Sequence, residues 1–464
     1  MSHRQRWVLV LTAIASLMVA LDVTVVATAL STIRLHLHAS ITQLEWTVNA
    51  YGLSFAVLLM TGAALGDRFG RRRLFVAGLA LFVAASAACA VSPSVGWLIA
   101  ARAVQGVGAA LITPTSLALL VEAFPPERRG QALGLFGAIT GLAVLAGPVV
   151  GGAVTQGLAW QWIFWLNVPI GLAAIPFVLR RMDESRGGRG AVDTPGLALV
   201  TAAALGVVWG LVRGNTAGWG SLEVLGALSA GVVSAVLFVL WELRTPEPML
   251  PMRLFRSRAF ASGNAVGFLM FASLFSAVFF MAQFMQTSLG QSPLHAGLRL
   301  IPWTGTVFIV SPIAGALVDR IGERPLLVGG LVLQAVGFTW VALLARAGLP
   351  YSEMIAPLIL AGTGVSSALP AAQNAVMSAV APTEIGKASG TFSTMRQLGG
   401  AFGLAIAVAV FSGAGSYASP VSFSNGFAPA IAVSAALSLG GALAAAWTPL
   451  RRVAPGRAAL EAAA

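Results

Sequence analysis

Long apolar segments alternate with short polar ones along nearly the whole chain. Each apolar segment holds about 20 residues, the length that an α-helix needs to cross a hydrocarbon core of ~30 Å. The segments lie near 7–30, 44–65, 74–92, 97–121, 131–157, 161–179, 195–214, 221–242, 261–287, 297–318, 326–346, 352–378, 388–412 and 427–447. The pattern predicts an all-α polytopic membrane protein with about fourteen transmembrane helices.

The chain is also duplicated. Several residues of the first half recur 256 residues later (362 − 106) in the second; the pairs include Gly106 and Gly362, Pro114 and Pro370, and Phe136 and Phe392. We therefore expect two six-helix bundles, over 1–180 and 259–450. The linker 181–258 would carry two extra transmembrane helices, and 451–464 would form a short cytoplasmic tail. In a membrane, paired halves of this kind are typical of alternating-access transporters.

Composition excludes a soluble domain, because 57% of the 464 residues are hydrophobic and only 9% are charged. The net charge of +12 does not indicate a nucleic-acid partner, since the basic residues follow the topology. Most lie in the N-terminus or in the even-numbered connections. The opposite side has Arg34, Arg213, Arg299 and Arg346. The positive-inside rule then places both termini in the cytoplasm, with membrane lipids around the chain. The Arg, Ala and Gly bias indicates a bacterial cytoplasmic membrane.

Asp22 and Arg102 are charges predicted inside the bilayer, where a functional role is the default hypothesis. Counting 1.5 Å per residue from the ends of their segments places both about 8 Å from the outer edge of the hydrocarbon core. Burial favours the protonated form of a carboxyl, whereas a guanidinium beside it favours the ionised form. The pair is therefore predicted to couple transport to protons. The alternative is a static ion pair that joins the first and fourth helices.

Two related strings, GDRFGRRR at 66–73 and VDRIGERP at 318–325, fall in predicted cytoplasmic turns. We expect them to gate the cytoplasmic face through helix caps or ion pairs; the candidates are Asp67, Arg68, Gly70 and Arg72, and in the second copy Asp319, Arg320, Gly322 and Arg324.

A third group of residues leaves one face of the fifth helix without large side chains: Gly147, Pro148, Gly151 and Gly152. This favours close packing against a partner helix that slides or rocks.

The substrate cavity has weaker candidates. Phe275 and Phe279 recur at helical spacing, which suits an apolar ligand, although a lipid-facing stripe is the alternative. The amides Gln283, Gln286 and Asn374 are expected to face the cavity, because unpaired amides are costly in lipid. Arg396 is a further buried charge and completes this set.

These motifs resemble the major facilitator superfamily, specifically its fourteen-span drug:proton antiporter branch. The resemblance lies in 63–73 and its copy 315–325, in Arg102 with Gln105 and Gly106, in Gly147 to Gly152, in LDVTVVATAL at 21–30, and in Lys387 to Gly403. It implies the two-bundle fold and export of hydrophobic, often cationic compounds driven by proton entry. Ala63, Ala27 and Ser31 depart from the usual pattern.

We therefore expect a proton-coupled antiporter that exports small hydrophobic drugs or antibiotics, as a monomer and without a cofactor or metal. A proton-coupled transporter of a nutrient or metabolite is the alternative, and a membrane sensor without transport is another. No paired-carboxylate or Cys/His constellation typical of an enzyme is present in the sequence.

Overall fold

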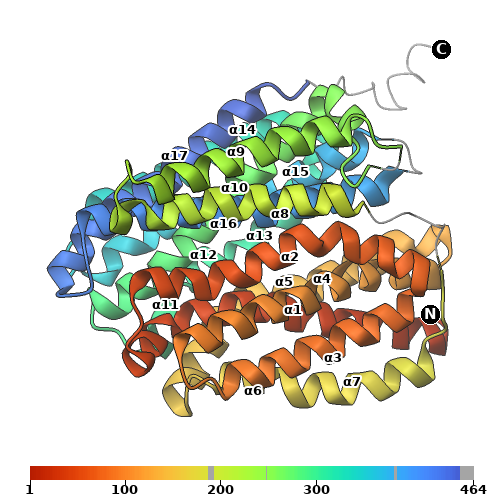
Figure 1. The fold of residues 1–464 in the computed structure, drawn as a ribbon, viewed down its shortest axis with the longest axis horizontal. Helices are drawn as coiled ribbons and strands as arrows, with labels where there is room; N and C mark the ends of the chain where they lie inside the picture. The colour runs from red at the N-terminus through yellow and green to blue at the C-terminus, as the bar shows by residue number, and fades with distance from the viewer. Residues whose placement is uncertain (187–192, 247, 381–383, 450–464) are drawn as a thin grey trace.

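The computed structural model describes residues 1–186, 193–246, 248–380 and 384–449 (Figure 1). Within these ranges the regular structure is entirely helical. The first half contains α1 (His3–Leu37), α2 (Ile41–Phe69), α3 (Arg71–Ala90), α4 (Val95–Ala123), α5 (Pro126–Gly157), α6 (Trp162–Trp165) and α7 (Asn167–Arg181). The middle of the chain forms α8 (Thr194–Ala217) and α9 (Leu222–Glu242).

The second half begins with the 3-10 turn η1 (Met252–Arg256). Its helices are α10 (Arg258–Thr287), α11 (Pro293–Arg299), α12 (Ile301–Thr304), α13 (Thr306–Ile321), α14 (Glu323–Leu344), α15 (Tyr351–Ser378), α16 (Ile385–Ala414) and α17 (Pro420–Ala446). Thirteen helical stretches of the described chain are long and apolar enough to cross a membrane; α6 with α7 form one of them, and so do α11 to α13. With the 32-residue α5 they match the predicted segments one to one, and the predicted polytopic fold is confirmed.

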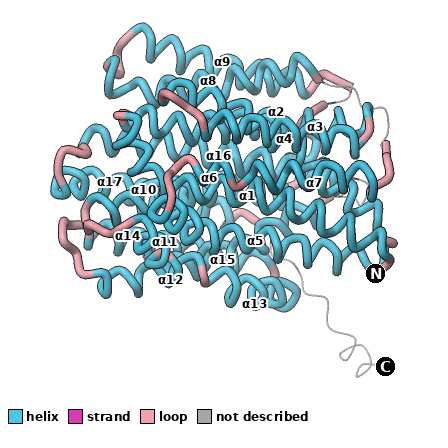
Figure 2. Tube along the Cα trace, turned by 90° about the horizontal axis from the view of Figure 1, so that it is seen from below, coloured by secondary structure: helices cyan, strands magenta, loops and turns pink. Residues whose placement is uncertain are grey.

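The helices form two bundles with a hairpin beside them (Figures 1 and 2). One bundle, from α1 to α7, has a core that includes Phe75, Leu79 and Phe82. The other, from α10 to α17, has a core that includes Leu327 and Phe392. The α8–α9 hairpin packs across the line between the bundles, where its apolar residues contact α2 and α16. The predicted tail 451–464 lies outside the described residues.

Short turns set the ends of the helices. Ser2 and Ser40 begin α1 and α2 with capping boxes, in which each serine side chain accepts from a backbone N–H one turn later. Gly70 and Gly322 join α2 to α3 and α13 to α14 with positive φ angles of 112° and 80°. An L-residue with a side chain rarely adopts such angles, so glycine at these two positions permits the tight turn.

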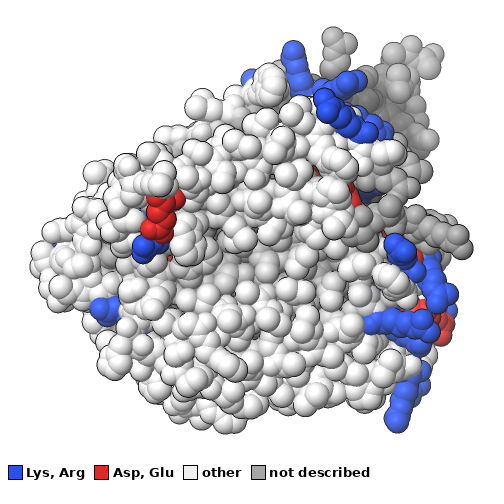
Figure 3. Space-filling model, viewed as in Figure 1, with Lys and Arg blue, Asp and Glu red and all other residues white. Residues whose placement is uncertain are grey.

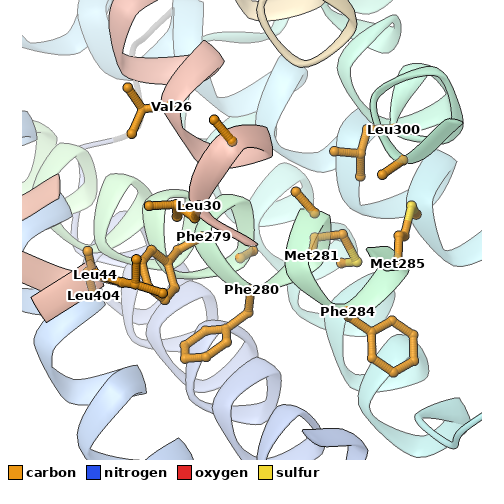
Figure 4. Close-up of a cluster of buried hydrophobic side chains, with 14 of the residues drawn as sticks. Val26, Leu30, Leu44, Phe279, Phe280, Met281, Phe284, Met285, Leu300 and Leu404 are labelled. Atoms are coloured by element: carbon orange, nitrogen blue, oxygen red, sulfur yellow. The ribbon is translucent and has the colours of Figure 1, made fainter. Parts of the chain in front are cut away.

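The two ends of the molecule differ in charge. Lys and Arg gather at the end where the chain starts (Figure 3). We call this the basic end; it holds the start of α1 and the turns α2–α3 and α13–α14. The opposite end holds the turns α1–α2, α8–α9 and α16–α17. A buried apolar cluster joins the two bundles there, with Leu30 and Leu44 from one and Phe279 and Leu404 from the other (Figure 4).

Candidate functional site

Asp22 and Arg102 meet as the sequence predicts. Arg102 on α4 donates through its terminal guanidinium nitrogen to the Asp22 carboxylate on α1, and each side chain is 1% exposed. Burial of both partners makes this pair a strong local constraint, because removing either one leaves an uncompensated charge in an apolar interior.

A polar network completes the site. Gln105 donates to Asp22 Oδ1 at 2.9 Å and accepts from Arg102 at 2.7 Å, so its amide links both charges. Asn167 on α7 donates to the same carboxylate oxygen at 3.3 Å. The Arg102 Nε–H donates to the carbonyl of Thr47 at 3.1 Å, which attaches the network to α2. Side chains of α4 and α7 therefore hold the Asp22 carboxylate of α1 directly, and α2 holds it indirectly through Arg102.

Arg102 also reaches the space between the bundles. Its guanidinium carbon lies 4.3 Å from the ring centroid of Tyr51. A narrow pocket opens beside it and draws its walls from both halves of the chain: Val23, Val48, Asn49, Tyr51, Gly52 and Arg102 from one, and Phe275, Gln397, Gly400, Ala401 and Leu404 from the other. A pocket between two bundles, next to a buried ion pair, is the arrangement expected of a transport site.

The glycines of α5 face two neighbours, α1 in the same bundle and α11 in the second bundle. A Cβ at Gly147 or Gly151 would collide with Thr24 or Thr28 of α1, so these two permit the close approach of α1 and α5. Gly152 faces the backbone of Pro293 and Leu294 in the second bundle, and Gly297 on α11 faces the backbone of Pro148. Pro148 and Gly152 therefore belong to an interface between the bundles at the opposite end.

Further contacts close the same end. Gln286 on α10 donates to the carbonyl of Thr28 at 2.9 Å. The guanidinium carbon of Arg34 lies 4.1 Å from the ring centroid of Tyr417. Leu294 N donates to the Gln156 side chain at 3.3 Å. Together with the apolar cluster of Figure 4, these contacts hold the two bundles together at the opposite end.

The structure separates the six cavity candidates. Phe275 lines the pocket, whereas Phe279 is packed in the apolar cluster near it. Gln283 donates to the carbonyl of Phe279 and accepts from Tyr417, and Gln286 belongs to the closed end.

Asn374 and Arg396 lie elsewhere in the second bundle. Asn374 donates to Glu323 at 2.7 Å, near the start of α14 and thus toward the basic end. Arg396 extends from α16 over Phe271 of α10, with 5.0 Å between its guanidinium carbon and the ring centroid.

At the basic end, the first turn motif forms ion pairs within its own bundle. Asp67 pairs with Arg71 at 2.8 Å, and Arg71 also pairs with Glu122 of α4 at 2.9 Å. Arg72 donates to the carbonyl of Met182 at 2.9 Å, and exposed Arg68 lies against the ring of Phe69. These contacts join α2, α3, α4 and the end of α7.

The second copy of the motif repeats the turn. Gly322 has the positive φ that Gly70 has, and Arg320 is exposed while Arg324 is partly buried. The side chain of Asp319 lies outside the described part of the structure. The gating roles assigned to the two motifs remain predictions.

Two functional candidates were missed by the sequence analysis. Glu184 accepts from the backbone N–H groups of Arg72 and Arg73 at 3.0 and 3.2 Å, and so caps α3. Glu45 on α2 is 0% exposed; its Oε1 accepts from Asn49 at 3.2 Å, while its Oε2 has no hydrogen-bond partner among the described residues. Glu45 lies at the edge of the predicted transmembrane segment 44–65, and a carboxylate within such a segment is the sequence feature that could have identified it.

Glu184→Gln is expected to lower the free energy of unfolding by about 1 kcal/mol, because a neutral amide caps the positive end of α3 less well than a carboxylate does. Thermal melting of the purified protein in detergent measures the change. Asp183→Asn is the matched control, since its carboxylate is 70% exposed and pairs with an exposed Arg4. Equal melting shifts in the two variants would contradict the assigned cap.

The sequence matches the profile of the Major Facilitator Superfamily over residues 12–249 and 264–463. The tetracenomycin C resistance and export protein of Streptomyces glaucescens is 36% identical over 85% of this chain and 73% of its own. The methylenomycin A resistance protein of Streptomyces coelicolor is 38% identical over 85% and 84%. The multidrug resistance protein Stp of Mycobacterium tuberculosis is 33% identical over 88% and 76%.

Solved structures agree at the level of the fold. A crystal structure of a POT family transporter with a thioalcohol-conjugated peptide superposes with a TM-score of 0.70, over 93% of this chain and 94% of that one. Its 14% sequence identity restricts the likeness to architecture. The profile match and the resistance proteins identify the family, and the chain belongs to the major facilitator superfamily, among members named for drug resistance and export.

Proposed function

We propose that this protein exports small hydrophobic compounds across the bacterial cytoplasmic membrane in exchange for protons. The observation that carries the proposal is the buried Asp22–Arg102 pair, whose guanidinium lines a pocket between the two bundles. The relatives named for antibiotic resistance, one of them also for export, support outward transport of an antibiotic-like small molecule. No cofactor is needed, because the proton gradient supplies the energy.

Asp22 is the proton-binding group of this mechanism. In the ion pair with Arg102 its carboxylate is stabilised by a full positive charge and by the amides of Gln105 and Asn167. A proton that binds the carboxylate removes its charge and weakens these contacts. Arg102 is then free to interact with the pocket, so protonation and occupancy of the pocket become linked.

Alternating access follows from the two-bundle arrangement. The contacts at Gly152 and Gly297 close the opposite end, and the positive-inside rule assigns that end to the outside. We therefore propose that this conformation is outward-closed, in a monomer whose termini are cytoplasmic. Rocking of the bundles would separate these contacts and expose the pocket to the other side of the membrane.

Uptake into inside-out membrane vesicles tests the proposal. With an acidic vesicle interior, we expect tetracenomycin C or methylenomycin A, the compounds named for two relatives, to accumulate in vesicles that contain the protein. A protonophore should abolish the accumulation. Substrate movement with the proton, out of the vesicle, would instead indicate a nutrient importer, and binding without any flux would indicate a sensor.

A further inference from the structure

Arg396 is a partly buried cation without a described counter-ion. Among the residues that the structure describes, no carboxylate lies within ion-pair distance of it. Its Nε is buried and has no hydrogen-bond partner, and its described neighbour is the ring of Phe271. Arg102, another arginine inside the bundles, has Asp22, Gln105 and the carbonyl of Thr47 as partners.

Arg396 lies one helical turn from the pocket. Gly400 on α16 and Phe275 on α10 both line the pocket, and the two helices are in close contact there, with a Cβ built at Gly400 3.0 Å from the Phe275 ring. Arg396 and Phe271 each precede these residues by four positions. Residues four apart share a helix face, so Arg396 and Phe271 continue the pocket wall toward the basic end.

A buried guanidinium Nε–H without a hydrogen-bond acceptor is costly. The guanidinium of an arginine stays protonated in proteins. Burying its charge in an apolar interior is unfavourable unless an anion or several hydrogen-bond acceptors lie beside it. The second bundle supplies Phe271 as a cation–π partner, which offsets part of that cost. The fork of N–H donors on Arg is well matched to a carboxylate or another oxyanion.

We infer that Arg396 binds an acidic group of the exported compound, so that the substrates of this pump are amphipathic anions such as carboxylates, phenolates or sulfonates. The inference rests on the proposed function, since it assigns the pocket between the bundles to the substrate. The apolar body of the ligand would lie against Phe271 and Phe275. Asp22 does not oppose the anion, because Arg102 neutralises it.

The remaining carboxylate near the pocket is Glu45. It lies one turn beyond Asn49 toward the opposite end, and Asn49 already donates to it. The Glu45 carboxylate and the Arg396 guanidinium therefore lie at opposite ends of the pocket wall. An organic cation would have to bind beside Arg396 to fill the pocket, and the like charge disfavours that position.

The test compares two fluorescent probes that share an aryl-amine body. 8-Anilino-1-naphthalenesulfonate carries a permanent negative charge, and N-phenyl-1-naphthylamine lacks it. Binding to the purified full-length protein in detergent is measured by fluorescence, with protein-free micelles subtracted. Arg396→Gln should weaken binding of the sulfonate at least ten-fold and change binding of the neutral amine less than two-fold, while Arg396→Lys should keep most of the affinity for the sulfonate.

Arg299→Gln is the matched control. Arg299 also lies over an aromatic ring, that of Tyr351 at 4.7 Å, but it ends the short helix α11 at the opposite end of the second bundle. Its loss should leave both affinities unchanged. Equal effects of Arg396→Gln on the two probes, or no effect on the sulfonate, would overturn the inference.

A second measurement does not depend on the variants. In the wild-type protein, laurate should displace the sulfonate better than methyl laurate does, and tetraphenylphosphonium should displace it poorly. Tight displacement by the cation would overturn the anion assignment. Binding needs no gradient, so a protein that binds anions through Arg396 but shows no proton-driven flux would retain this inference and refute the proposed function. Proton-driven efflux without preference for anions would support the proposed function and refute the anion inference.

Discussion

Asp22→Asn is expected to reduce proton-driven efflux to the level of protein-free liposomes. Asparagine cannot bind and release the proton, and it leaves the Arg102 guanidinium without its counter-ion in an interior where each side chain is 1% exposed. Breaking a buried pair from one side costs about 3–5 kcal/mol, so the variant should also melt earlier. The measurement is substrate flux in proteoliposomes with and without an imposed pH gradient.

Asp22→Glu separates the chemical role of the carboxyl from its structural one. Glutamate keeps a titratable group and a counter-ion for Arg102, so part of the proton dependence should return. The exposed Asp183 offers a control in the same bundle, because Asp183→Asn makes the same carboxyl-to-amide change outside the network. Efflux by Asp22→Asn that still follows the pH gradient would contradict the proton-binding role and leave the static ion pair as the explanation.

The position of the Asp22–Arg102 pair could be predicted from the sequence, because the depth of a residue in the membrane follows from its distance along the helix. Asp22 and Arg102 lie at known distances from the ends of apolar segments, and helices rise 1.5 Å per residue, so two charges at one level were expected to meet. The segments themselves, and the duplicated halves, came from hydrophobic length and internal repetition. Both are properties that each helix carries on its own.

Neighbours across the bundle were not predictable in the same way. Helical periodicity shows that Gln283 and Gln286 share a helix with Phe275, but only the packed fold shows that Gln286 donates to the Thr28 carbonyl at the closed end. Glu45 was not singled out from the sequence, because nothing in one sequence shows that the neighbours of α2, which begins at Ile41, bury its carboxyl. Burial of this kind depends on which helices surround a residue, and one sequence does not give that.

The structure also relates the proton site to the closed end through α1. Asp22 lies on the same helix as Thr24 and Thr28, which contact the bare face of α5 at Gly147 and Gly151. Thr24 also donates to the carbonyl of Ala143 on α5 at 3.1 Å. A change at the carboxylate therefore acts on a helix that is tightly packed against the one that meets the second bundle. We propose this contact path as the physical route by which protonation of Asp22 would bias the opening of the opposite end.

Gly152→Ala is expected to favour opening of that end and to lower efflux at least ten-fold. A methyl group at Gly152 would lie 2.8 Å from Leu294 Cα and closer still to the carbonyl of Pro293. Both are backbone atoms, so the clash is relieved only by moving the bundles apart. Overpacking of this size costs about 1–3 kcal/mol, and each 1.4 kcal/mol shifts the balance between closed and open states ten-fold.

Labelling by a membrane-impermeant maleimide reports the state of the end directly. Leu404→Cys in a Cys89→Ser background places one thiol at the pocket wall, and added Gly152→Ala should make it react faster from outside the cell. Gly157→Ala is the matched control, because it makes the same change on the same helix where a Cβ meets nothing within 4 Å. Both substitutions add one methyl group to α5, so a difference in labelling reports the contact between bundles. Equal labelling rates would show that the Gly152 contact does not hold the opposite end closed.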